Sequence, residues 1–241
     1  MPPDLTTQIA VVTGAGRGIG RAICLSLAQA GARVVASART LAEIQAVADE
    51  ITAAGGQAHA VPLDVADEAS GRALFATVGE RWGRLDILVN NAGVGRYGAV
   101  ADFPLDDLDH LIRVNLRGTF LCCQEAMRMM VPAGRGAIIN ISSVVGFKGY
   151  PRQAAYTATK HAVMGLTKSL AVEAQANGIR VSAVLPGGVD TDLVRQARPD
   201  LDPAILLQPE DVAQTVLFLL SLSDRAAVDQ VYIRRWASQP F

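Results

Sequence analysis

The sequence has few cysteines and histidines, and they form no recognisable metal-binding or disulfide pattern. Its three cysteines are an odd number, and Cys122 and Cys123 are adjacent in the chain. We therefore expect free thiols in a reducing cytoplasm, and no metal site. The three histidines, His59, His110 and His161, are scattered, so we interpret them as structural or solvent-facing.

An excess of charge of either sign is also absent. The 22 basic and 23 acidic residues leave a net charge of −1, which predicts no general attraction to nucleic acid or to an anionic membrane. No apolar run reaches the ~18 residues of a membrane span. Residues 1–7 lack the basic and apolar segments of a secretory signal. The expected partners are small molecules and other copies of the chain.

What the sequence does contain is enough apolar material for a large core, since 50% of its 241 residues are hydrophobic and 19% are charged. Short apolar runs alternate with helical patterns, which predicts a single doubly wound Rossmann-like α/β domain over residues 1–241, with a seven-stranded parallel sheet and helices on both faces. The predicted strands are Ile9–Thr13, Arg33–Ser37, Ala58–Pro62, Ile87–Asn90, Ala137–Ile141, Val181–Leu185 and Gln230–Ile233, and the predicted helices are Gly18–Ala30, Leu41–Ala54, Glu68–Trp82, Leu105–Met130, Ala154–Asn177 and Pro209–Ser221.

A glycine-rich turn follows the first predicted strand. Gly14, Gly18 and Gly20 lie between that strand and an amphipathic segment, in the spacing Gly-x3-Gly-x-Gly. This spacing departs from the common Gly-x-Gly-x-x-Gly dinucleotide fingerprint. A strand, a glycine turn and a helix N-terminus nevertheless form a cradle for a pyrophosphate, because free backbone N–H groups point at the anion. The alternative is a glycine-rich hairpin or helix cap.

Tyr156 and Lys160 are four residues apart, and Ser143 precedes the tyrosine by thirteen residues. On a helix this spacing brings the phenol and the ammonium to one face, with Cβ atoms about 5–6 Å apart. A nearby cation favours phenolate and lowers the phenol pKa, so the pair is typical of a tuned acid and base. By itself the pair is a weak signal, because Tyr and Lys occur at this spacing on many surface helices.

Together these motifs resemble the short-chain dehydrogenase/reductase family over nearly the whole chain. Thr13-Gly14-x3-Gly18-x-Gly20 is similar to its cofactor motif, and Asn90-Asn91-Ala92-Gly93 to its signature after the fourth strand. The resemblance implies the strand order 3-2-1-4-5-6-7 and an oxidoreductase. It also implies a catalytic set of Asn115, Ser143, Tyr156 and Lys160, and cofactor contacts from Gly14, Arg17, Gly18, Ile19, Gly20, Arg39, Asp64, Val65, Asn91, Gly93, Tyr156, Lys160, Pro186, Gly187, Val189 and Thr191.

The resemblance implies that Tyr156 moves the proton and Lys160 holds the nicotinamide ribose. Ser143 would donate a hydrogen bond to the substrate oxygen, and the family's thirteen-residue spacing between serine and tyrosine favours it over Ser142. Asn115 is similar to an asparagine that anchors a water next to the lysine. Its alternative role is a locally bonded polar group within a helix.

NADP(H) is the predicted cofactor. An acidic residue about 20 residues beyond the glycines would hold the ribose hydroxyls of NAD, whereas an arginine there accommodates the extra phosphate of NADP. No Asp or Glu occurs between Arg21 and Thr40, and Ala38 and Arg39 occupy the discriminating positions. Asp64 resembles a residue at the adenine edge, or it is an ordinary helix cap.

The substrate is the least determined part of the prediction. Residues 190–208 are a candidate substrate lid, with a plain surface loop as the alternative. The C-terminal end, with Arg234 and Arg235, is similar to the branch that acts on short hydroxy acids, ketones and aldehydes. Those arginines interact with an acidic substrate or are simply solvated. Phe147, Tyr150, Val94 and Tyr97 are expected to shape the pocket.

We therefore predict an NADPH-dependent enzyme that transfers a hydride between nicotinamide and a carbonyl or secondary alcohol. A ketoacyl carrier protein reductase is the alternative enzyme, and a non-catalytic cofactor-binding regulator is the alternative from another class. Leu105–Met130 and Ala154–Asn177 carry more apolar residues than one sheet contact needs. We expect them to form the interface of a homo-oligomer, either a dimer or a tetramer.

Overall fold

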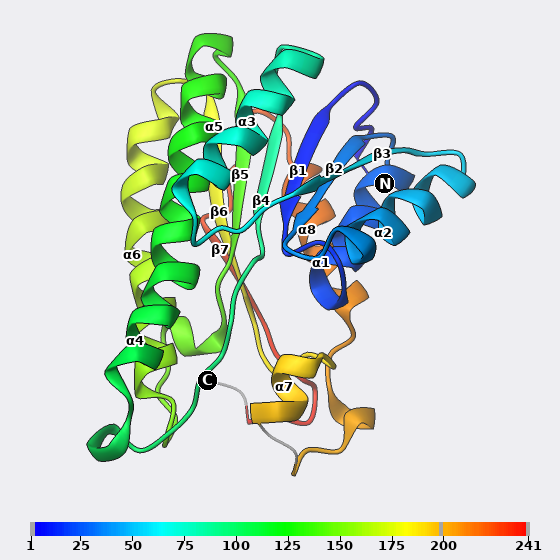
Figure 1. Cartoon of the computed structure of the whole chain (residues 1–241). Coiled ribbons are helices and arrows are strands. Elements are labelled where there is room, and N and C mark those ends of the chain that lie inside the picture. Colours follow the sequence, from blue (N-terminus) through cyan, green and yellow to red (C-terminus); the bar gives the residue numbers. More distant parts are fainter. Residues whose placement is uncertain (1–2, 198–199, 240–241) are drawn as a thin grey trace.

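The computed structural model describes residues 3–197 and 200–239. Its seven strands form one parallel sheet in the order β3-β2-β1-β4-β5-β6-β7, which confirms the predicted fold class and strand order (Figure 1). The order reverses between β1 and β4, and this switch point is where doubly wound sheets bind ligands. The strands are β1 (Ile9–Thr13), β2 (Arg33–Ala38), β3 (Gln57–Pro62), β4 (Ile87–Asn90), β5 (Gly136–Ile141), β6 (Ile179–Pro186) and β7 (Gln230–Ile233).

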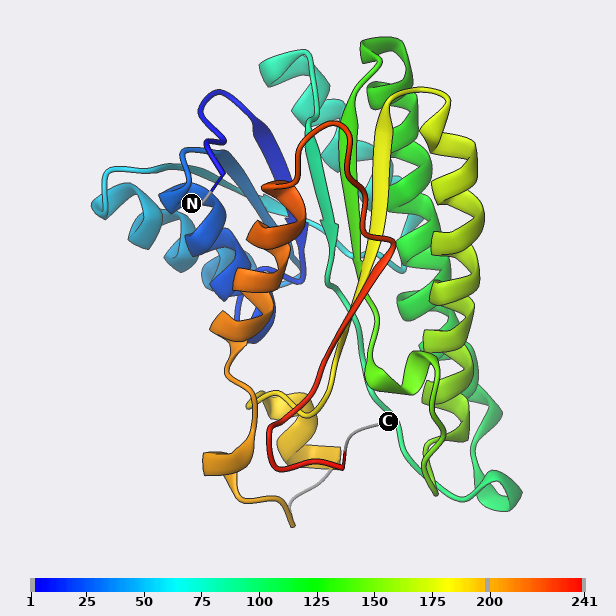
Figure 2. The ribbon, with the colours of Figure 1, turned by 180° about the vertical axis from the view of Figure 1, so that it is seen from behind.

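Helices cover both faces of the sheet, and the two views of the ribbon show this sandwich from opposite sides (Figures 1 and 2). Side chains of α1 (Gly18–Gln29), α2 (Leu41–Ala53) and α8 (Pro209–Leu220) belong to one hydrophobic core. A second core lies on the other face, and its helices are α3 (Glu68–Trp82), α5 (Thr119–Ala133) and α6 (Ala154–Gln175).

Strand β1 explains why the strands appear as continuous apolar runs in the sequence. Ala10 and Val12 point into the first core, whereas Ile9 and Val11 point into the second. Successive side chains of a strand alternate between faces, so a strand covered on both faces needs apolar residues at every position. All five residues of β1 are buried.

The segment predicted as one helix, Leu105–Met130, is divided into three parts. It comprises α4 (Leu105–Leu111), a π-helical turn η2 (Ile112–Gly118) and α5, which continues to Ala133. Gly118 explains part of this arrangement, because a Cβ there would lie 2.8 Å from the Val65 backbone oxygen. The close approach of the β3–α3 loop thus fits a glycine at this turn.

Several predicted ends differ from the structure by one or two residues. Helix α6 ends at Gln175 rather than Asn177, because Gly178 adopts φ +68°, a left-handed conformation that ends the helix. Within the predicted lid lie α7 (Asp192–Ala197) and η4 (Pro203–Ile205), while residues 198–199 of that segment are outside the described residues. The remaining short elements are η1 (Val100–Asp102) and η3 (Val144–Gly146). Among the helices of the described residues, none has the length and apolarity to cross a membrane.

Gly20→Ala tests the close packing behind the glycine turn. The new Cβ would lie 2.1 Å from the Gly14 carbonyl oxygen and 2.6 Å from the Asn91 amide nitrogen. We expect the free energy of unfolding to fall by about 1–3 kcal/mol or more, as for overpacked cores. Gly165→Ala is the control, since Gly165 is exposed on α6 and has open space around its Cβ position. That change should stabilise the chain, by up to about 1 kcal/mol. Urea denaturation measures both variants, and equal stability of the two would contradict the packing argument.

Candidate active site

A cleft of about 950 Å³ lies at the carboxyl edge of the sheet. Its lining comes from the segments that follow all seven strands, with Gly14 after β1, Asn91 after β4 and Ser143 after β5. The predicted site residues Gly20 and Asn115 do not line the cleft and lie behind its wall, where both are buried. The predicted residues that do line it are Gly14, Arg17, Gly18, Ile19, Arg39, Asp64, Val65, Asn91, Gly93, Ser143, Tyr156, Lys160, Pro186, Gly187, Val189 and Thr191.

Asn91 joins the loop after β4 to the glycine turn after β1. Its side-chain amide donates hydrogen bonds to the carbonyl oxygens of Thr13 and Gly14, both at 3.0 Å. The Thr13 hydroxyl in turn accepts the backbone N–H groups of Asn91 (3.1 Å) and Ala92 (3.0 Å). These four bonds set the relative position of the two loops at the switch point.

The glycine turn fits a dinucleotide. Gly14 and Gly18 have φ values of +64° and +52°, which glycine adopts without strain. A Cβ on Gly14 would lie 2.8 Å from the Ala92 Cα, so only glycine permits the approach of the two loops. The turn leads into the N-terminus of α1, where free N–H groups and the helix dipole favour an anion. The cradle is thus bounded by backbone, as a pyrophosphate requires.

Tyr156 and Ser143 form the polar centre of the cleft. The Tyr156 side chain is buried, and burial raises its pKa well above the ordinary value of 10.0. The nearby Tyr97 phenol also raises this pKa, while a hydrogen bond with Ser143 lowers it. Ser142 is separate from this pair, because its hydroxyl donates to the Lys160 carbonyl at 3.2 Å.

Lys160 is expected from the sequence to lower the Tyr156 pKa, but in this geometry burial dominates and raises that pKa. The ammonium donates instead to the carbonyl oxygen of Ile141 at 3.0 Å, and lies 5.8 Å from the centre of the Tyr156 ring. Burial lowers the pKa of Lys160 from 10.5 to about 8, because a buried ammonium loses its hydration.

Asn115 holds the segment after β4 against α6. Its Oδ1 accepts the Val94 N–H at 2.9 Å, and its Nδ2 donates to the Val94 carbonyl and to the Thr159 hydroxyl at 3.0 and 3.2 Å. These partners are distant in sequence, so the alternative of a locally bonded helix group is wrong. The π-helical turn that contains Asn115 packs against α6, next to Lys160.

At the other end of the cleft, Arg39 lies at the start of the β2–α2 loop. Arg17 forms an exposed ion pair of 3.1 Å with Asp192 of α7, so it is already partnered. Asp64 is not the cap of α3, because Asp67 has that role and accepts the Ala69 N–H. The Asp64 carboxylate accepts instead the N–H of Ala66.

Sequence reasoning missed an acidic side chain near the glycine turn. Glu43 lies in the first turn of α2, and its carboxylate oxygen would be 2.7 Å from a Cβ on Gly16. Glu43 lies three residues beyond Thr40, outside the segment 21–40 in which the sequence pattern places an acidic ribose ligand. Sequence reasoning also missed a buried hydrogen-bonded group below the cleft, in which Asn90 donates to Asn140 and Asn140 donates to Thr167. An asparagine in each of two neighbouring apolar strands was the available signal.

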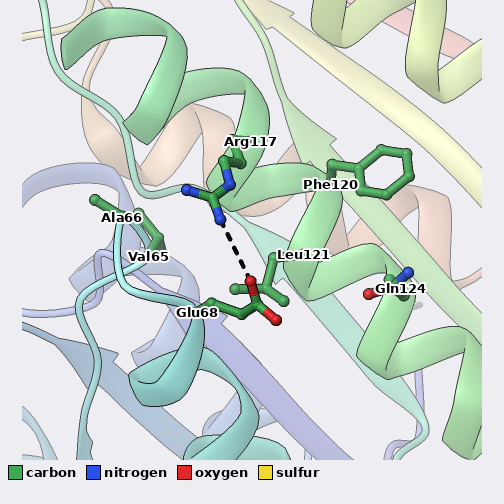
Figure 3. Close-up of a pocket in the computed structure, with 7 residues that line it drawn as sticks. All are labelled: Val65, Ala66, Glu68, Arg117, Phe120, Leu121 and Gln124. Carbon is green, nitrogen blue, oxygen red and sulfur yellow. Dashed lines mark hydrogen bonds and ion pairs between the residues drawn. The ribbon is translucent and has the colours of Figure 1, made fainter. Parts of the chain in front are cut away.

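A second, smaller cavity of about 190 Å³ lies between the β3–α3 loop and α5 (Figure 3). Arg117 crosses it to form a 3.3 Å ion pair with Glu68. The described residues lining it include no nucleophile and no histidine, so the acid–base chemistry belongs to the larger cleft. Its lining consists of Val65, Ala66, Glu68, Arg117, Phe120, Leu121 and Gln124.

The strand order, the backbone cradle and the group of Ser143, Tyr156 and Lys160 in one cleft define a class of protein, the dinucleotide-binding α/β oxidoreductases. Comparison with known sequences gives the family. The sequence profile of short chain dehydrogenases matches residues 8–202, so the chain belongs to the short chain dehydrogenase family. The resemblance seen in the sequence is thereby confirmed.

Three similar proteins indicate the range of the family around this chain. A 3beta-hydroxysteroid dehydrogenase of Mediterraneibacter gnavus is 44% identical over 80% of this chain and 70% of its own length. A 3-oxoacyl-[acyl-carrier-protein] reductase of Synechocystis is 42% identical over 89% of this chain and 90% of its own. A metagenomic short-chain oxidoreductase solved in complex with NADP is 37% identical, with a TM-score of 0.86, 98% of this chain covered and 100% of that chain.

The buried ammonium of Lys160 predicts a pH-dependent stability without cofactor. The unfolded chain keeps this proton up to a pH of about 10.5, whereas the folded chain releases it near 8. The wild type should therefore gain stability relative to Lys160→Met as the pH rises from about 8 to 10.5, by about 3 kcal/mol in total. The difference between the wild type and Lys160→Met is free of any contribution from titration of the three cysteine thiols, because both proteins contain them. Lys168→Met, an exposed change on the same helix, should show no such trend in denaturation at each pH.

Proposed function

We propose that this chain is an NADPH-dependent oxidoreductase that reduces the carbonyl group of a small molecule, or oxidises the matching alcohol, with Tyr156 as acid and base. The observation that carries this proposal is the buried Tyr156 phenol, which lies in the same cleft as Ser143, Lys160 and the glycine cradle. NADPH oxidation followed against ketones, aldehydes, keto acids and acyl thioesters tests it. Absence of turnover on all of them and on the matching alcohols would contradict it.

The raised pKa of Tyr156 suits proton donation. Bound NADPH would supply the hydride to the carbonyl carbon. The Tyr156 phenol, neutral at physiological pH, would donate its proton to the substrate oxygen. Ser143 donates a hydrogen bond to the same oxygen, where negative charge develops. In the reverse direction Tyr156 accepts the alcohol proton, which requires phenolate and therefore favours high pH.

Lys160 would hold the ribose hydroxyls of the bound cofactor through its ammonium. A lysine whose pKa lies near 8 also exchanges its proton readily near neutral pH. Asn115 positions Val94 and the wall beside this lysine through its three hydrogen bonds. It acts as a positioning residue.

A reductase of ketoacyl groups on a carrier protein is the second candidate. It is favoured by the 42% identity to the Synechocystis 3-oxoacyl-[acyl-carrier-protein] reductase over almost the full length of both chains. A regulator without turnover is the least supported, since the serine, tyrosine and lysine all line the cleft. Acyl thioesters in the substrate panel separate the two enzymes.

Residues 190–208 act as the substrate lid of a single-domain enzyme that resides in the cytoplasm. Backbone hydrogen bonds hold the two ends of this segment together. The Asp190 N–H donates to the Leu207 carbonyl oxygen, and the Leu207 N–H donates to the Gly188 carbonyl oxygen. Leu193, Val194 and Leu201 from the segment line the cleft. The three cysteines are free and buried, which suits a reducing compartment.

Tyr156→Phe tests the acid. The variant should lose turnover by at least about a hundredfold, as expected for a general acid, while NADPH affinity stays nearly intact. Lys160→Ala should weaken both. Tyr232→Phe is the matched control, because that phenol lies outside the cleft lining and its ring packs on Phe147. Steady-state kinetics and equilibrium cofactor binding measure the three variants, and near-normal turnover of Tyr156→Phe would exclude it as the acid.

Arg39 determines the preference for NADPH. Hydrogen bonds to a charged group contribute about 1.5–3 kcal/mol, which corresponds to a preference of roughly ten- to a hundredfold over NADH. Arg39→Ala should reduce this preference, and Ala38→Asp should reduce it further by repelling the phosphate. Dissociation constants for both cofactors at fixed salt test this. Equal or tighter NADH binding in the wild type would overturn the cofactor assignment and leave the tyrosine mechanism standing.

The layer of α4, η2, α5 and α6 forms the interface of a dimer or homotetramer. Phe120 on α5 is 52% exposed and Val172 on α6 is 75% exposed, and Leu105 of α4 and Ile112 of η2 are exposed as well. Apolar surface spread over every element of one layer suits coverage by a second copy of the chain. Phe120→Asp combined with Val172→Asp should reduce the mass measured by light scattering at micromolar concentration. A wild-type monomer under the same conditions would refute the interface.

A further inference from the structure

The two arginines after β7 have different environments. The Arg234 guanidinium is occupied within the C-terminal turn, where one nitrogen donates to the carbonyl oxygens of Arg235, Trp236 and Ser238 at 3.1, 3.0 and 2.7 Å. Arg235 lines the cleft instead. Its Cδ and Nε lie 3.5 and 3.6 Å from the Cβ position of Gly188, so its side chain runs over the turn that follows β6.

Most arginines that line the cleft already have acidic partners. Arg17 pairs with Asp192, and Arg96 with Asp107 at 3.5 Å. Arg195 pairs with Asp190 at 2.9 Å. Among the arginines that line the cleft, only Arg39 and Arg235 form no ion pair or side-chain hydrogen bond with any residue that the structure describes.

These two free guanidinium groups are at opposite ends of the cleft. Arg39 follows β2 and Arg235 follows β7, and five strand intervals separate these strands in the sheet order. At ~4.8 Å per interval, the strands are about 24 Å apart. The cofactor phosphate that we propose at Arg39 therefore cannot also contact Arg235.

The end of β7 is held next to the substrate side of the cleft. The Gly187 N–H donates to the carbonyl oxygen of Ile233 at 2.8 Å, which ties the turn after β6 to the last residue of β7. Arg235 comes two residues later and is half-buried. Leu206 from the proposed lid lies against the same glycine, 3.2 Å from the Cβ position of Gly188.

We propose that Arg235 binds a carboxylate group on the substrate, so that the enzyme acts on small keto acids and the matching hydroxy acids. This inference rests on the proposed function. A guanidinium presents two parallel N–H groups to a carboxylate, which orients the substrate as well as attracting it. In the reduction, a hydride adds to the ketone carbon and a proton from Tyr156 adds to its oxygen, and the carboxylate at Arg235 is unchanged.

The test compares unbranched alpha- and beta-keto acids with their neutral methyl esters. We expect Arg235→Gln to lower kcat/KM for the acids about ten- to a hundredfold, mainly through KM, as for a lost hydrogen bond to a charged group. The esters should change by less than about twofold, and Arg235→Lys should be intermediate. Arg225→Gln is the matched control, because Arg225 is exposed in the loop before β7, at the opposite edge of the sheet.

Two further arms distinguish the other sources of an anion. If the Arg235→Gln variant lost activity on a phosphorylated ketone but kept its activity on the keto acids, the carboxylate assignment would be overturned. The assignment would also be overturned if the enzyme preferred a ketoacyl pantetheine thioester over every keto acid and Arg235→Gln left the turnover of that thioester unchanged. If the acids and esters are reduced equally well and Arg235→Gln leaves their ratio unchanged, the inference fails and the oxidoreductase function stands.

Equilibrium binding keeps the inference testable without turnover. Calorimetry of butanoate and butanamide with the NADP-loaded wild type should detect tighter binding of butanoate, and Arg235→Gln should abolish the difference. Equal binding of both compounds to the wild type would overturn the proposed carboxylate contact. Failure of the proposed function has a different signature, since no carbonyl compound, neutral or charged, would then be reduced.

Discussion

The contact between Asn91 and the glycine turn is the constraint on which the site depends. At the switch point, the chain leaves the neighbouring strands β1 and β4 in opposite directions along the sheet order. The side-chain amide of Asn91 joins the two loops there, because it donates to the carbonyl oxygens of Thr13 and Gly14. These carbonyls are partly buried and need donors. The absent side chains of Gly14 and Gly20 create the room for the amide, so the cradle and the clamp are one packing unit.

Burial is the second determinant of the chemistry. It raises the pKa of Tyr156 and lowers that of Lys160, so both groups are driven toward their neutral forms. The neutral phenol is the form of tyrosine that can donate a proton. A lysine whose pKa lies near the ambient pH can both release and accept a proton. The same apolar surroundings that stabilise the fold thus set the protonation states on which the proposed mechanism relies.

The arginines that line the cleft form two groups, those with an aspartate partner and those without one. The loop after β2 carries Arg39, and the segment after β7 carries Arg235, while the arginines between them are neutralised by aspartates of α4 and the lid segment. Pairing prevents these arginines from competing for an anion. The two arginines without acidic partners are therefore the ones that we propose for the cofactor phosphate, at Arg39, and the substrate carboxylate, at Arg235.

The sequence by itself determined the sheet, the glycine cradle and the Ser143, Tyr156 and Lys160 set, because these depend on local patterns: apolar runs, glycine spacing and a four-residue helical repeat. Only the tertiary structure decided that Lys160 bonds to the Ile141 carbonyl, that Asp67 caps α3, and that Arg235 lines the cleft while Arg234 does not. Each of these depends on side-chain direction and on contacts between distant segments. Spacing along the chain carries no information about which neighbour a flexible side chain reaches, and burial follows only from packing.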